Sequence, residues 1–209
     1  MVKAKRKRAA RPGAAKPVSW GGMRAPARDR RLNRILAAAA ALLVVAGAVW
    51  GWWHFSARWA FDALAAEGAG ALAQVETERD AGRDHLAPGQ PFAYPHPFPT
   101  SGPHDPAWTP PGVYQVEQPP TKLVHALEHG NIVIYHDDPG EAVMAQLRDW
   151  SRRYSGQWDG VVVTPAQGLG REIVLTAWTK RLRLEPFDPA AAAAFIDAFR
   201  GRGPEHPVR

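Results

Sequence analysis

The sequence contains no cysteine and only three methionines. The absence of cysteine excludes disulfide bonds, thiolate metal sites and thiol catalysis. Only Met144 lies beyond the first 34 residues, which disfavours a methionine-rich site for Cu(I). A folded domain of this composition must therefore be stabilised by its hydrophobic core or by a bound ion.

Several short motifs that mark common enzyme classes are also missing. The chain has no G-x-S-x-G elbow, no phosphate-binding P-loop and no G-x-G-x-x-G turn. These absences leave esterase, nucleoside triphosphatase and dinucleotide-binding functions without support.

Acidic residues are almost absent from residues 1–34, which carry twelve lysines and arginines against one acid, a net charge of +11. The rest of the chain carries −5, so the overall charge of +6 does not describe the body of the protein. No nucleic-acid partner is expected, because the basic charge belongs to a tail rather than to a folded surface. This Pro- and Arg-rich tail lacks apolar periodicity and is predicted to be disordered and cytoplasmic, in contact with anionic lipid.

Charged residues are absent from residues 35–55, ILAAAAALLVVAGAVWGWWHF. A run of this length in helical form crosses about 30 Å of hydrocarbon, so it predicts a transmembrane helix in the lipid bilayer. Arginines precede the run and tryptophans crowd its end, which predicts a single pass through the cytoplasmic (inner) membrane with the C-terminal part outside. The alternative is a signal peptide cleaved near Ser56-Ala57. The length of the run and the tryptophan cluster favour the anchor.

Residues 56–84 are predicted to form a helical stalk or linker, interrupted at Gly68 and Gly70. A proline-rich stretch follows over residues 88–120, and its prolines disfavour helices and central strands. Its aromatic residues offer apolar surface to bury, so we expect an ordered, extended loop over the domain.

Regular elements alternate through the exported domain, which we place at residues 85–205. Their order, β-α-β-β-β-α, predicts a small α+β domain with one mixed β-sheet and packed helices. Asp188 is predicted to cap the last helix. The order of elements leaves ferredoxin-like and thioredoxin-like arrangements open. The expected strands are 131–136, 160–165, 171–178 and 180–187, and the expected helices are 121–129, 141–154 and 189–201.

The stretch LVHALEHG, residues 123–130, places His125 and His129 four residues apart. On a helix these side chains project from one face and can bind one ion together. His104 and His85 lie on irregular loops that could supply the further ligands, and Glu128 offers an oxygen. Zinc is the expected ion and Cu(II) the next, because imidazole suits both.

Two other interpretations of these residues remain open. His125 to His129 matches H-x-x-E-H, in which two histidines hold zinc and the glutamate activates water; Glu128 would be the catalytic base and Glu205 a distant acidic ligand. Alternatively, the histidines accept hydrogen bonds from the loop backbone and only fix the fold, in a structural or assembly partner of other membrane proteins.

Five segments of the chain carry distinct motifs: PTSGPHDPAW (99–108), GVY (112–114), VHALEHGNIVIY (124–135), LTAW (175–178) and FIDAFRGRGPE (195–205). Together they resemble the bacterial domain-of-unknown-function family 3105, over about residues 80–205. The resemblance implies a single-pass, membrane-anchored protein with an exported domain, and it makes His85, His104, His125, Glu128 and His129 motif positions without implying an activity. Related sequences often carry a cysteine where this chain has Pro111, so the resemblance does not carry over a mechanism that depends on that cysteine.

Overall fold

The computed structural model describes residues 30–209. The chain divides into two compact units, Met1–Gly51 and Trp52–Arg209, and the helix α1 (Arg30–Glu67) contributes residues to both. Residues 1–29 of the predicted basic tail lie outside the described residues. The limits 1–34, 35–55, 56–84 and 85–205 of the expected segments stay predictions.

Helix α1 contains a stretch, Arg31–Trp52, that is long and apolar enough to cross a membrane. Its 22 residues span about 33 Å at helical rise. None of this stretch is buried, so it does not serve as a core helix of the described part of the chain. A signal sequence near the N-terminus also meets this criterion of length and apolar composition, so these features fit either an anchor or a signal sequence.

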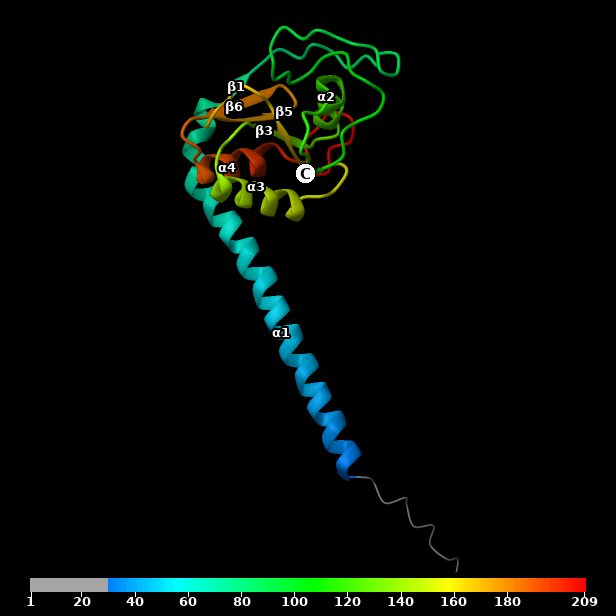
Figure 1. The fold of residues 1–209 in the computed structure, drawn as a ribbon, viewed down its shortest axis with the longest axis vertical. Helices are drawn as coiled ribbons and strands as arrows, with labels where there is room; N and C mark the ends of the chain where they lie inside the picture. Colours follow the sequence, from blue (N-terminus) through cyan, green and yellow to red (C-terminus); the bar gives the residue numbers. More distant parts are fainter. Residues whose placement is uncertain (1–29) are drawn as a thin grey trace, which may run out of the picture. The chain divides into compact units, whose positions relative to one another are not determined.

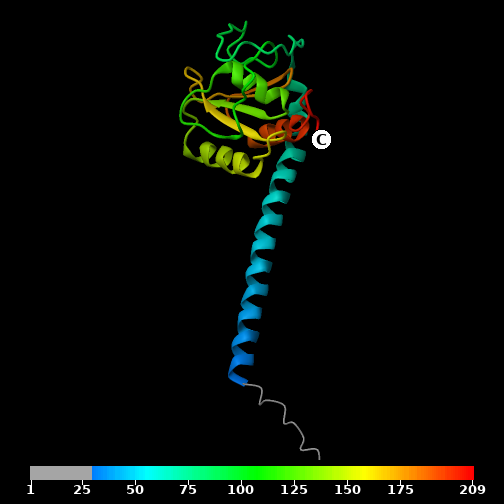
Figure 2. The same ribbon diagram turned by 90° about the vertical axis from the view of Figure 1, so that its right-hand side faces the viewer.

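The second unit is built on one six-stranded mixed sheet with the order β1-β6-β5-β3-β4-β2. Strands β2, β3 and β4 pair in parallel, whereas β5 pairs antiparallel with both β3 and β6. Helix α2 lies on one face of the sheet, and α3 and α4 lie on the other (Figures 1 and 2). In chain order the elements are η1 (Gly68–Gln74), β1 (Glu76–Thr77), β2 (Gly112–Val113), α2 (Pro120–Glu128), β3 (Ile132–His136), α3 (Glu141–Arg153), β4 (Val161–Pro165), β5 (Ile173–Ala177), β6 (Lys180–Leu184) and α4 (Pro189–Phe199).

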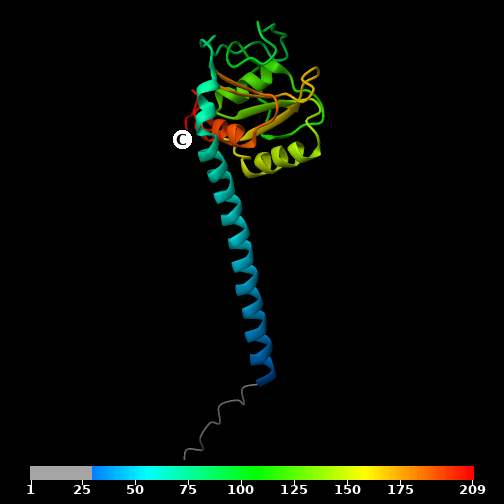
Figure 3. The same cartoon turned by 90° about the vertical axis from the view of Figure 1, so that its left-hand side faces the viewer.

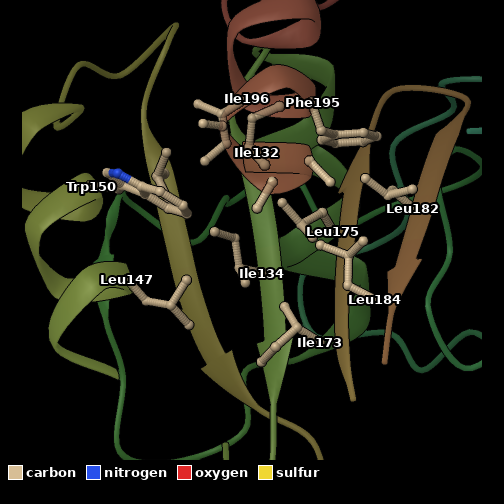
Figure 4. Packing of buried hydrophobic residues seen from close by; sticks show 14 of the residues in the cluster. Ile132, Ile134, Leu147, Trp150, Ile173, Leu175, Leu182, Leu184, Phe195 and Ile196 are labelled. Carbon is tan, nitrogen blue, oxygen red and sulfur yellow. The ribbon is translucent and has the colours of Figure 1, made fainter. Parts of the chain in front are cut away.

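Side chains on successive strand positions point to opposite faces, so the sheet has a hydrophobic cluster on each side. Ile132 and Ile134 of β3 pack toward α3 and α4 with Trp150 and Phe195, as Figure 4 shows. Val133 and Tyr135 of the same strand belong to the cluster under α2. Because both faces are covered, β3 is buried at every position.

The predicted α+β class with one mixed sheet is confirmed. The helices and strands lie within two residues of their expected limits, except that β6 ends at Leu184, three residues before its expected end at residue 187. Asp188 caps α4 as predicted, because its side chain accepts hydrogen bonds from the backbone N–H groups of Ala190 and Ala191. The parallel β3–β4 pair and the antiparallel β3–β5 and β5–β6 pairs agree with the thioredoxin-like arrangement, although residues 166–172, all described, contain no helix between β4 and β5. The two-residue strands β1 and β2 were not predicted.

Residues of the expected stalk contribute to the folded unit. Phe61 is 3% exposed and makes edge contacts with Trp150 and Tyr154. Strand β1 pairs with β6 at the edge of the sheet. The folded unit therefore extends on the N-terminal side of residue 85.

The proline-rich segment is ordered and lies on the α2 side of the sheet, opposite α3 (Figures 1 and 3). Phe98 is buried against Tyr135, and the backbone N–H of Thr109 donates to the carbonyl of Lys122 on α2. Aromatic side chains thus hold an extended segment in place, as its composition indicates. This contact brings the loop histidines to α2.

Candidate metal centre

Helix α2 and its C-cap residue carry three buried ionisable side chains, those of His125, Glu128 and His129. Pro120 occupies the first turn, where its missing N–H costs no hydrogen bond. The helix gives way to β3 through Gly130, whose φ of 98° favours glycine. The proline-rich loop and the C-terminal segment cover this end of α2, so its polar side chains are buried although the helix lies outside the sheet.

The loop brings two further histidines to the helix. His104 N donates to Asp84 O at 3.0 Å and Leu86 N donates to His104 O at 2.8 Å, which forms a parallel bridge between His85 and His104. The ring of His125 lies 4.8 Å from that of His104 and 5.2 Å from that of His85, measured between centroids. One ligand atom from each of His85, His104, His125 and Glu128 lies within 4.8 Å of all the others.

Two hydrogen bonds define the protonation of the buried rings. His104 Nδ1 lies 2.9 Å from Gly102 O, and His125 Nδ1 lies 2.8 Å from Asp105 O. A carbonyl oxygen can only accept, so each Nδ1 is the donor and each neutral ring keeps its lone pair on Nε2. The rings therefore donate to the loop backbone rather than accept from it, and each has the tautomer that a ligand bonded through Nε2 requires.

The sharpest electrostatic feature is the contact between His104 and Glu128. His104 Nε2 lies 3.0 Å from Glu128 Oε2 but has no hydrogen bond of good geometry. Burial lowers the pKa of His104. Burial also raises the pKa of Glu128, and the nearby negative charge of Glu205 raises it further. Arg83 Nε lies 3.8 Å from the other carboxylate oxygen. A ring lone pair and a carboxyl oxygen this close need a cation or a proton between them.

A second group of ligand atoms consists of His125, His129 and Glu205, again within 4.8 Å of one another. Glu205 Oε2 lies 3.0 Å from His129 Nε2 and 4.0 Å from His125 Nε2. Burial and the neighbouring His125 lower the pKa of His129 to about 4, so this ring is neutral near pH 7. Trp108 and Trp158 contact the His129 ring, with centroids 4.7 and 4.3 Å away.

The structure brings together all five residues expected from the sequence, but it divides them. His85, His104, His125 and Glu128 form one group, whereas His129 joins His125 and Glu205 in the other. That any of them binds a metal stays a prediction. The orienting carbonyls of Gly102 and Asp105 were missed, because every residue has a carbonyl and its direction depends on the folded backbone.

The family described as "Protein of unknown function (DUF3105)" matches residues 85–209. The chain belongs to the DUF3105 family. Comparison with curated proteins and with solved structures gives no match. The DUF3105 region begins at His85 and includes Glu205, so both groups of ligand atoms lie within it.

Proposed function

We propose that this protein is a membrane-anchored, extracytoplasmic DUF3105 domain that binds one divalent metal ion through His85, His104, His125 and Glu128. The observation that carries the proposal is the 3.0 Å approach of His104 Nε2 to Glu128 Oε2 without a hydrogen bond. A metal ion between the two atoms satisfies both, and it stabilises the negative carboxylate in a buried place. Zinc is the first choice and Cu(II) the second.

The dimensions of the group suit a tetrahedral ion after a small contraction. Ligands at 2.0–2.1 Å from zinc lie about 3.3 Å from one another, whereas the atoms here lie within 4.8 Å. His104 and His125 are held by their Nδ1 hydrogen bonds, so the exposed His85 is the ligand that is free to approach. Three neutral imidazoles and one carboxylate are ligands that zinc accepts.

The anchor and its orientation rest on separate support. The apolar stretch Arg31–Trp52 has the length of a membrane span, and ten of the twelve lysines and arginines of residues 1–34 precede it. Because cytoplasmic flanks carry the excess of lysine and arginine, the DUF3105 region lies on the opposite side of the membrane.

Metal content and thermal melting test the metal site directly. For the full chain, purified in detergent with a tag free of histidine, elemental mass spectrometry is expected to find about one zinc per chain. An ion at 100 times its dissociation constant contributes about 2.7 kcal/mol, so a chelator is expected to lower the melting temperature by about 8 °C.

His96→Ala is the matched control, since His96 is exposed and belongs to neither group of ligand atoms. That variant is expected to keep its zinc. If the wild-type chain contains no metal and the chelator leaves its melting temperature unchanged, the metal site is wrong. A proton would then lie between His104 and Glu128, and the cluster would be a structural scaffold.

A second candidate function is supported by the second group of ligand atoms. An ion held by His125, His129 and Glu205 has three protein ligands and keeps a fourth position for water, as catalytic zinc sites do. Glu128 is then outside the ligand set, as the general base of an H-x-x-E-H hydrolase is.

In that case Glu128→Gln is expected to retain the ion and to lower turnover at least about 100-fold. Hydrolysis of peptide and ester panels measures this, with the exposed Glu117→Gln as control. If the four-residue site is the true one, Glu128→Gln weakens metal binding instead. A zinc-loaded wild type that is inactive on every panel would eliminate the hydrolase.

A further inference from the structure

We infer that His125 is the common ligand of two overlapping ion positions, and that a single zinc ion exchanges between them. The inner position consists of His85, His104, His125 and Glu128, and the outer position consists of His125, His129 and Glu205. This inference rests on the proposed metal-binding function and adds to it a path by which the ion is taken up and released.

Occupation of the two positions is mutually exclusive because of one hydrogen bond. His125 Nδ1 donates to Asp105 O at 2.8 Å, so only Nε2 is available to an ion. That atom has a single lone pair, and it also faces Glu205 Oε2 at 4.0 Å. An ion bonded to His125 Nε2 therefore has either the inner or the outer ligands around it.

The two positions differ in the number of ligands and in access. The inner position has four protein ligands, enough to complete a tetrahedral zinc, and includes His104, which is 0% exposed. The outer position has three, and its Glu205 side chain is 43% exposed. An incoming or departing ligand can thus occupy the fourth place at the outer position while His125 still holds the ion.

The surrounding structure keeps the two sets of ligands at this spacing. Glu205 N donates to Glu128 O at 3.3 Å, which ties the outer carboxylate to the helix that carries the inner one. Arg83 Nε lies 3.8 Å from Glu128 Oε1, and Arg83 Nη1 donates to Pro204 O at 3.5 Å. Arg83 therefore links the inner ligand Glu128 to the residue that precedes the outer ligand Glu205.

The experiment follows zinc transfer from the full chain in detergent to a fluorescent zinc chelator, together with zinc content at saturation. Glu205→Gln is the main variant, because its exposed side chain can change without disturbing the fold. Wild type is expected to bind one zinc per chain. Glu205→Gln is expected to keep that zinc and to transfer it at least tenfold more slowly. His85→Ala is expected to bind zinc at least tenfold more weakly and to transfer it no more slowly than wild type.

Glu117→Gln is the control, since its exposed carboxylate lies outside both groups. It is expected to match wild type in both measurements. Two zinc ions per chain at saturation, or transfer from Glu205→Gln at the wild-type rate, would overturn the shared-ligand inference while leaving metal binding intact. A wild-type chain that binds no zinc would overturn the proposed function itself.

Discussion

Replacement of His125 by asparagine is expected to lower zinc affinity by more than about 100-fold, the largest loss for any single residue of the centre. His125 belongs to both groups of ligand atoms, so its loss weakens the inner and the outer position together. Loss of His85 or His129 leaves one complete group. Zinc content after dialysis, measured by elemental mass spectrometry, checks the ranking.

Asparagine is chosen because it separates ligation from folding. Its side-chain amide can replace the Nδ1–H donor to Asp105 O, whereas no atom replaces Nε2. Alanine would leave that buried carbonyl unpaired, at about 1–3 kcal/mol. His125→Asn is therefore expected to fold and to lack zinc, and near-stoichiometric zinc in this variant would contradict both ion positions.

Substitution of Gly203 by alanine is expected to destabilise the DUF3105 region by about 3 kcal/mol, because the C-terminal segment passes directly over the end of α2. An added Cβ would lie 2.1 Å from Glu128 O and 2.2 Å from Gly130 N, both backbone atoms that cannot move aside alone. We expect a melting temperature lower by about 9 °C, measured by circular dichroism. Zinc affinity is expected to fall as well, since the same contact sets the position of Glu128 against Glu205.

The matched control is Gly70→Ala, which adds the same methyl group in η1 with no heavy atom within 4 Å. Its effect on stability is expected to stay within about 0.5 kcal/mol. If Gly203→Ala has the same melting temperature as the wild type, the close packing of the C-terminal segment on α2 is wrong. The placement of Glu205 near α2 would then be wrong as well.

Local patterns in the sequence predicted most of the fold. The apolar run before the domain, the helical spacing in α3 and the short apolar strands each reflect a periodicity of 3.6 or 2 residues that neighbouring positions establish by themselves. The Asp188 cap is equally local, since the carboxylate bonds N–H groups two and three residues further on. Strands β1 and β2 contain two residues each, too few for any periodicity, and exist only because a partner strand is already in place.

Local sequence patterns did not predict how the histidines of the candidate centre are grouped. Helical spacing alone places His125 and His129 on one face of α2, because four residues make about one turn. The folded chain instead divides the pair, because the loop that carries His85 and His104 reaches one side of His125 and the C-terminal segment with Glu205 reaches the other. Both approaches depend on contacts between residues far apart in sequence. The lone pair left on Nε2 of His104 and His125 depends on them too, because the carbonyls of Gly102 and Asp105 are positioned by the folded loop and by nothing in the motif itself.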